Sequence, residues 1–214
     1  MDLEALAPPG SVLVALADHG QPLDLPPGET QLVAGSVEKR RRDFALGRTC
    51  ARAALARLGH DSWVLGRAPS GAPLWPDGIV GSITHTKAFA AAMAAPADRF
   101  RAIGIDAECS GGVDDRLGRR LFTDGERAWL SGQGDALRPA LATLLFSAKE
   151  AYFKAFHPLE GRMPDFRQVE VEVVPGTGVF SVRQPDARDG WAAPVPGRFV
   201  IGDGLVVTAL CLEA

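Results

Sequence analysis

The order of the expected elements constrains the fold of this 214-residue chain more than any single motif does. An apolar run at residues 11–17 is typical of a strand, and residues 36–58 carry a long helical pattern. Three strand-like runs follow, and then further helices precede about four more strand-like runs. Because helices followed by strands occur twice, the sequence predicts an α+β fold of two similar lobes with the active site in the cleft between them.

The two lobes are expected to comprise residues 1–105 and 106–214, meeting near the glycine- and aspartate-rich segment 108–115. Within the first lobe, Ser36 is a suitable N-cap for the long helix and Gly59 a suitable stop. The other expected strands are residues 79–86, 88–95, 100–108, 168–174, 178–184, 197–202 and 205–213, the later helices residues 124–132 and 136–156, and the main loop residues 68–78.

Composition excludes several classes of protein. The net charge of −3 gives no general attraction for nucleic acid or an anionic membrane, so any anion site must be built locally. The three cysteines are too few and too scattered for a disulfide framework or a zinc knuckle. The N-terminal residues do not resemble a signal peptide, and the longest apolar run, "AFAAAMAA", is too short to span a bilayer. We therefore expect a cytoplasmic protein.

Two arginines occupy unexpected places on the helix over residues 36–58. At 100° per residue Arg40 and Arg48 fall on or beside its apolar stripe, whereas Lys39 and Arg42 point away and are expected in solvent. Arginine is rarely buried without a partner, so a structural carboxylate and a bound phosphate are both open for Arg40 and Arg48. The stripe itself consists of Val37, Phe44, Ala51, Leu55 and Leu58.

Hydroxyl groups surround a histidine at the end of the expected strand 79–86. Within "GSITHT", His85 is accompanied by Ser82, Thr84 and Thr86. These side chains could donate hydrogen bonds to phosphate oxygens, although a single histidine is more often a structural residue.

Two carboxylates end the expected strand 100–108. Asp106 and Glu108 are two residues apart and so share one face of the strand. Carboxylates this close repel one another unless a proton or cation joins them. Oxygen ligands favour magnesium, with manganese tolerated, and the alternative is a solvated acidic strand end.

Charges and aromatic rings share one side of the helix over residues 136–156. Glu150 and Lys154 lie opposite its apolar stripe, with Phe146 and Phe153 alongside. Glu150 and Lys154 could form a surface pair, but the flanking rings favour the wall of a cleft. The stripe contains Leu137, Leu141, Leu145, Ala148, Tyr152 and Ala155.

Several of these segments together resemble the 4'-phosphopantetheinyl transferases, in particular the larger type with two lobes in one chain. The motifs that carry the resemblance are "GIDAE" at residues 104–108 and "FSAKEAYFKA" at residues 146–155. The segments "EKRRRDF", "GAPLWPDG" and "GSITHT" also occur in the family's order. The likeness covers roughly residues 36–158 and is specific as a set.

The resemblance implies a ligand and a role for each of these side chains. Coenzyme A is the implied co-substrate, and Mg²⁺, with Mn²⁺ as an alternative, the implied metal. The "PSGAP" backbone would lie along the adenine, although Ser70 stands where many relatives carry a charged residue. The implied metal ligands are Asp106, Glu108 and Glu150; the phosphate-binding residues are Arg40, Arg48, Arg67, His85, Ser82 and Thr84; and Lys149 and Lys154 would contact the pyrophosphate.

The implied reaction transfers the phosphopantetheine arm of coenzyme A to a serine of an apo acyl or peptidyl carrier protein in polyketide, peptide or siderophore synthesis. Glu150 is the implied base and Lys154 would stabilise developing charge. Because one chain supplies both lobes, we expect a monomer. A protein that binds coenzyme A or a nucleotide without transfer is a rival interpretation. A different magnesium-dependent phosphotransferase or hydrolase lacks support, because the sequence has no glycine-rich phosphate loop.

Overall fold

The computed structural model describes residues 1–174, 176–185 and 191–214, and its strands form two antiparallel sheets and one short hairpin. The strands are β1 (Val12–Ala17), β2 (Gly66–Arg67), β3 (Pro73–Leu74), β4 (Ile79–Thr86), β5 (Phe89–Pro96), β6 (Phe100–Cys109), β7 (Glu170–Val174), β8 (Val179–Arg183), β9 (Val195–Gly202) and β10 (Leu205–Glu213). The first sheet has the order β1-β5-β4 and the second the order β6-β10-β9-β8-β7, while β2 pairs with β3.

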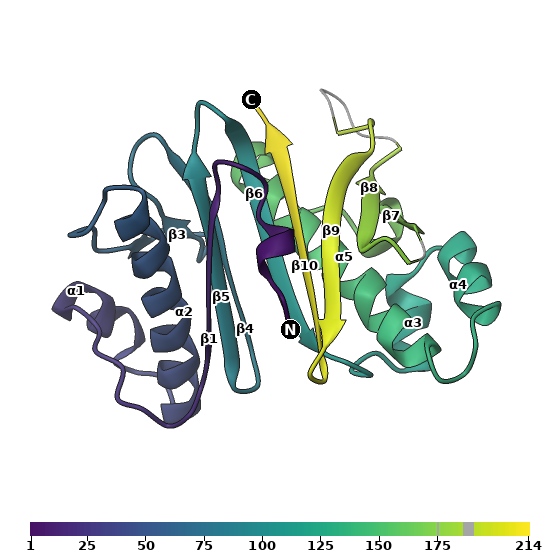
Figure 1. Ribbon diagram of the computed structural model, residues 1–214, viewed down its shortest axis with the longest axis horizontal. Helices are drawn as coiled ribbons and strands as arrows, with labels where there is room; N and C mark the ends of the chain where they lie inside the picture. Colours follow the sequence, from purple (N-terminus) through teal and green to yellow (C-terminus); the bar gives the residue numbers. More distant parts are fainter. Residues whose placement is uncertain (175, 186–190) are drawn as a thin grey trace.

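Helices accompany each sheet (Figure 1). The first lobe contains α1 (Pro27–Thr30), α2 (Glu38–Arg57) and the 3-10 helix η2 (Gln31–Val33). The second contains α3 (Asp115–Leu121), α4 (Asp124–Ser131), α5 (Arg138–Glu160) and the 3-10 helix η3 (Phe166–Gln168). The N-terminal 3-10 helix η1 (Glu4–Leu6) lies against β9 and β10 of the second sheet. The predicted α+β architecture of two lobes is confirmed. The expected strands and long helices are present to within a few residues at each end, whereas α3 and the β2–β3 hairpin were not predicted.

Successive side chains of β5 point to opposite faces, and one of these faces packs against the second sheet. Ala90 and Ala92 pack toward α2, whereas Phe89 and Met93 join a second buried cluster with Ile105 of β6. The period of two along a strand sends successive residues to opposite faces, so β5 is buried on both. A third core lies beneath α5, where Tyr152, Phe156 and Trp191 are in contact.

The sheets divide between β5 and β6, earlier than the expected boundary at residue 105, which lies inside β6. The segment 108–115 connects β6 to α3 and so lies wholly within the second lobe. In Figure 1 β4 and β6 run next to each other although they belong to different sheets. The carboxylates expected at the end of β6 therefore lie at the junction between the lobes.

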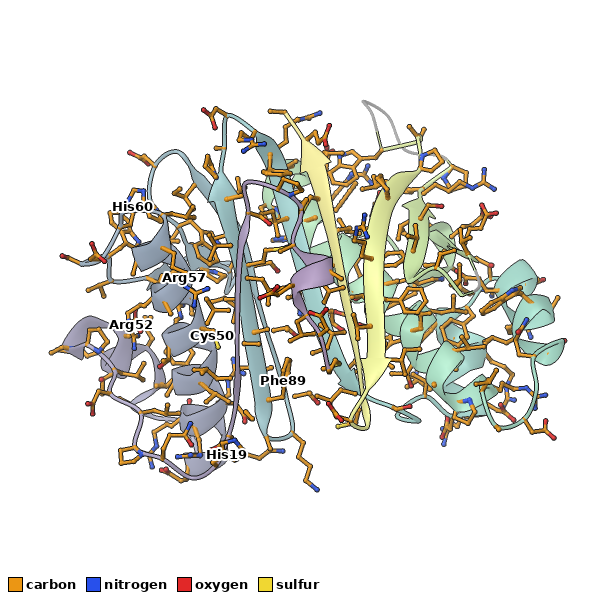
Figure 2. The ribbon with its side chains drawn as sticks, in the orientation of Figure 1. His19, Cys50, Arg52, Arg57, His60 and Phe89 are labelled. Atoms are coloured by element: carbon orange, nitrogen blue, oxygen red, sulfur yellow. The ribbon has the colours of Figure 1, made fainter. Side chains whose placement is uncertain are left out.

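The buried face of α2 matches the predicted stripe only in part: Ala51 and Leu55 are fully buried, as predicted. Val37 precedes the helix as its N-cap and is 74% exposed, so it cannot anchor a buried stripe, and Ser36 is not the cap. Leu46 and Cys50, which were not predicted, are also buried against the sheet, and Figure 2 shows Cys50 on that side of α2. Gly59 follows the last turn with φ +88°, as expected of a helix stop. Among the described residues, no helix is long and apolar enough to cross a membrane.

Candidate active site

An acidic centre forms where the end of β6 meets α5. Asp106 is only 4% exposed, and its Oδ1 accepts a hydrogen bond from Nζ of Lys154 at 2.7 Å. The same ammonium donates to the carbonyl oxygen of Ile105 at 3.1 Å. Oδ2 of Asp106 is buried and has no hydrogen-bond partner among the described residues. Since buried carboxylate oxygens are normally satisfied, Oδ2 indicates a ligand at this position.

Glu108 and Glu150 share the electrostatic field of Asp106. Burial, followed by the charge of Asp106, raises the pKa of Glu108 to about 7. Burial and Asp106 likewise raise the pKa of Glu150, with Lys154 opposing the change. The charge of Asp106 thus acts on both glutamates, and that of Glu150 on Glu108, while the shared metal site of the three carboxylates stays a prediction. Like charges at this spacing favour a bound proton or cation.

The donor set suits a hard cation that keeps part of its water shell. Among the described residues, no three acidic, histidine or cysteine side chains form a preformed metal cluster. Magnesium commonly takes only one or two protein carboxylates and completes its octahedron with water and substrate phosphate. The unsatisfied Oδ2 of Asp106 and the excess negative charge are thus compatible with such an ion.

The mixed face of α5 forms one wall of a cavity of about 580 Å³. Glu150, Phe153 and Lys154 line it together, so the prediction that this face borders a cleft is confirmed. Trp75 and Ile83 of the first lobe line it as well. Trp75 was not predicted as a site residue, although its place in the turn-rich loop "GAPLWPDG" was a signal, because binding residues are often on loops. The cavity lies between the lobes.

A smaller basic cavity of about 160 Å³ adjoins the larger one, with Pro73 and Ile83 in the walls of both. The structure brings together the four side chains expected to bind the phosphates of a nucleotide. They are Arg40, Arg48, Arg67 and His85.

The "PSGAP" turn separates the two cavities. Gly71, at φ +92°, lines the basic cavity, whereas Ser70 and Ala72 line the larger one. The turn is closed by a backbone hydrogen bond from Gly71 to the carbonyl oxygen of Ala68 at 2.8 Å.

Arg40 and Arg48 have different surroundings. Arg48 is 3% exposed and donates to the carbonyl oxygens of Leu65 and Gly66 at 2.7 and 3.1 Å, so of the two alternatives for its partner the structural carboxylate is not the one found. Arg40 is exposed, contrary to its predicted place near the core, and its Nη1 lies 3.1 Å from Nε2 of His85.

Lys39 and Arg42 of the "EKRRR" run also differ from each other. Lys39 is exposed, as expected. Arg42 is not a solvated residue, because it forms an ion pair with Asp18 and donates to the carbonyl oxygen of Gln21.

Ser82 and Thr84 face the junction between the lobes. They are 5% and 2% exposed, and their hydroxyl oxygens accept hydrogen bonds from the backbone N–H groups of Ile105 and Ala107 at 3.2 and 3.0 Å. Thr84 also donates to Asp106, so the prediction that it donates to a nucleotide was wrong, because a sequence pattern does not distinguish an inward from an outward hydroxyl. Ser82 lines the larger cavity, and its role toward a nucleotide stays a prediction.

Lys149 also lies outside the site. Its side chain is completely buried, and Nζ donates to the carbonyl oxygens of Leu121 and Phe166 at 2.9 and 2.8 Å and to Oε2 of Glu126 at 2.7 Å. These three bonds use all the protons of the ammonium group. The predicted contact between Lys149 and a pyrophosphate was therefore wrong.

Comparison with known proteins identifies the family. Residues 28–95 match the model of the 4'-phosphopantetheinyl transferase N-terminal domain, and residues 102–193 match that of the 4'-phosphopantetheinyl transferase superfamily. The 4'-phosphopantetheinyl transferase Npt of Nocardia iowensis is 38% identical over 97% of this chain and 98% of its own length. The 4'-phosphopantetheinyl transferase Svp of Streptomyces mobaraensis is 43% identical over 88% of this chain and 78% of its own length.

A partial match is found among solved structures. The holo-[acyl-carrier-protein] synthase of Thermotoga maritima is 20% identical over 53% of this chain and 64% of that one, with a TM-score of 0.38. The family assignment rests on the sequence comparisons, which cover both lobes. This chain therefore belongs to the 4'-phosphopantetheinyl transferases, and it is an enzyme of their larger, two-lobed type.

Proposed function

We propose that this enzyme transfers the 4'-phosphopantetheine arm of coenzyme A to a serine of an apo acyl or peptidyl carrier protein and releases 3',5'-ADP. The observation that carries the proposal is the contact between a basic cavity and a larger cavity that contains Glu150 and Lys154. Coenzyme A has a matching division into a phosphorylated adenosine end, a central pyrophosphate and a largely uncharged arm.

The basic cavity would hold the 3'-phosphate, with the guanidinium groups as donors. Arg40 and Arg67 are exposed at this cavity and can adjust to an anion, whereas Arg48 is fixed by its carbonyl partners and supplies charge from the wall. Charge-assisted bonds from arginine to phosphate are strong and directional. Binding energy gained at this end would position the pyrophosphate next to Lys154.

Asp106, Glu108 and Glu150 would hold Mg²⁺, with Mn²⁺ as a substitute. A divalent ion at this place supplies charge neutralisation for the phosphoryl oxygens. Lys154 uses two of its three N–H donors on Ile105 and Asp106, which leaves one to donate to a phosphate oxygen in the cavity.

Glu150 would accept the proton of the carrier serine, directly or through water. Partial burial raises its pKa, and a carboxylate with a raised pKa is a stronger base. The serine oxygen then forms a bond to the β-phosphorus of coenzyme A. The bond from that phosphorus to the bridging oxygen breaks, and 3',5'-ADP leaves with the electron pair.

The test is an intact-mass assay with coenzyme A, MgCl₂ and a panel of apo carrier proteins from fatty acid, polyketide, peptide and siderophore synthesis. We expect a mass gain of one phosphopantetheine group on at least one carrier, and no gain after EDTA treatment. Binding of coenzyme A without transfer to any carrier would contradict the proposal and favour a binding protein. The fastest carrier would indicate the pathway.

We further propose that one copy of the chain is sufficient for activity, because both walls of the larger cavity come from the same chain. Size-exclusion chromatography with light scattering should then give the mass of a monomer at assay concentrations. A dimer that loses activity on dilution would contradict this proposal.

A further inference from the structure

Side-chain hydroxyls join the two sheets where backbone hydrogen bonds would be expected. β4 and β6 are edge strands of different sheets and lie side by side, yet they form no backbone ladder. The N–H groups of Ile105 and Ala107 donate instead to Oγ of Ser82 and Oγ1 of Thr84. Buried N–H groups without partners are costly, so these two hydroxyls replace the missing ladder bonds.

Thr84 has a second contact that Ser82 lacks. Its Oγ1 lies 3.3 Å from Oδ1 of Asp106. Because Oγ1 already accepts the N–H of Ala107 at 3.0 Å, the single proton of the hydroxyl is available for the Asp106 carboxylate. Oδ1 therefore receives one hydrogen bond from each lobe, from Thr84 of β4 and from Lys154 of α5.

We propose that Thr84 is a positioning residue that fixes the rotation of the Asp106 carboxylate. With Oδ1 held by Thr84 and Lys154, the orphaned Oδ2 is the oxygen left for an external ligand. The backbone bond from Ala107 fixes the hydroxyl itself, so the first lobe sets the geometry of an acidic group in the second. The statement about metal binding rests on the proposed function, whereas the statement about orientation does not.

Ser82 provides a matched control. It lies on the same strand, is similarly buried and accepts an equivalent N–H bond, but it does not contact the carboxylate. Replacement of Ser82 by Ala removes a bond between the lobes and leaves Asp106 with both of its donors.

The first experiment measures Mn²⁺ binding by electron paramagnetic resonance for the wild-type protein and for T84V, T84S and S82A. We expect T84V to bind Mn²⁺ about tenfold more weakly or worse, since groups that orient metal ligands typically contribute this much. T84S, which keeps the hydroxyl, and S82A should bind within about twofold of wild type. Equal binding by T84V and wild type, or equal weakening in T84V and S82A, would overturn the metal part of the proposal.

The second experiment needs no metal. A double-mutant cycle between T84V and D106A is measured by urea unfolding in EDTA, with S82A and D106A as the comparison cycle. We expect T84V to change the unfolding constant at least about threefold less in the D106A background, and S82A to act additively. Additivity of T84V with D106A would overturn the orientation itself. T84A would take the place of T84V if the latter does not fold.

The two experiments separate the two proposals. If the double-mutant cycle shows coupling between Thr84 and Asp106 but the wild-type protein binds no Mn²⁺, the metal is removed from the proposed function. Thr84 is then still the residue that orients Asp106.

Discussion

Nζ of Lys149 on α5 lies 2.7 Å from Oε2 of Glu126 on α4, and both side chains are removed from solvent. Glu126 also accepts backbone N–H bonds from Thr123 and Val171, and Lys149 donates to two carbonyl oxygens. The pair therefore ties the segment between α3 and α4 and the start of β7 to α5, the helix that carries Glu150.

Removal of one member of this pair should destabilise the protein severely. We expect K149M to lower the free energy of unfolding by about 3–5 kcal/mol, because it leaves a buried carboxylate without its cation. The double variant K149M/E126Q should be less destabilised than the sum of the single variants. Urea unfolding followed by fluorescence measures both quantities. A K149M protein of unchanged stability but weaker coenzyme A binding would restore the pyrophosphate role that the geometry argues against.

Gly104 should not tolerate even one added carbon atom. A Cβ placed there would lie 1.8 Å from the carbonyl oxygen of Ala151, so β6 and α5 are in direct backbone contact. We expect G104A to lower the free energy of unfolding by about 3 kcal/mol, since the overlap falls on backbone that must move. G134A is the control, because a Cβ at Gly134 meets nothing within 4 Å. Similar unfolding midpoints for the two variants would show that the two backbones are not in close contact.

The helices and strands could be predicted well from the sequence, because they depend on local patterns. Asp106 and Glu108 lie at the end of an apolar strand, and Glu150 stands opposite an apolar helical stripe, so periodicity indicated the face on which each side chain lies. The same reasoning was only partly right for α2, where Ala51 and Leu55 are buried as predicted but Val37 lies just outside the helix.

Long-range partners could not be predicted from one sequence. Arg42 with Asp18, Lys149 with Glu126 and Thr84 with Asp106 all join segments separated by more than twenty residues. Periodicity gives the face on which a side chain lies but not the group that it meets across the core. Lys149 and Thr84 were therefore assigned to the ligand although their hydrogen bonds are internal.

Arg40 and Arg42 lie on the same helix and form a matched pair for testing the basic cavity. We expect R40A to weaken coenzyme A binding about tenfold or more, because a charge-assisted bond to phosphate is lost. The loss for 3'-dephospho-coenzyme A should be less than about threefold, since the partner of the arginine is absent from that ligand.

Isothermal titration calorimetry measures both ligands, with R42A as the control because Arg42 pairs with Asp18 away from the cavity. Equal losses of both ligands in R40A would mean that Arg40 does not contact the 3'-phosphate.

Two of the three thiols should be unreactive in the folded protein. Burial raises the pKa of both Cys50 and Cys211 to about 12, so at pH 8 only about one thiol in ten thousand is ionised. Because the thiol pKa is higher in the folded protein than the ordinary value of 9.0, the neutral buried thiols contribute to the free energy of unfolding fully below pH 9. This contribution is lost as the pH rises toward about 12.

Labelling with iodoacetamide at pH 8, read by peptide mapping, should therefore modify the partly exposed Cys109 first. All three thiols should react in urea, which controls for the intrinsic chemistry of each peptide. Equally fast labelling of Cys50 and Cys109 without denaturant would show that α2 opens from its sheet.

Replacement of Glu150 is the most direct test of its proposed role as the base. We expect E150Q to lower single-turnover transfer by about a hundredfold or more, because the amide cannot accept the serine proton. Coenzyme A affinity should fall only a few-fold, since Arg40, Arg48 and Arg67 are unchanged. E160Q is the matched control on the same helix: Glu160 accepts a bond from Nε1 of Trp191 at 3.0 Å, and a glutamine oxygen can keep that bond. Wild-type turnover in E150Q would assign the proton transfer to another group, whereas equal losses in E150Q and E160Q would indicate general damage to α5.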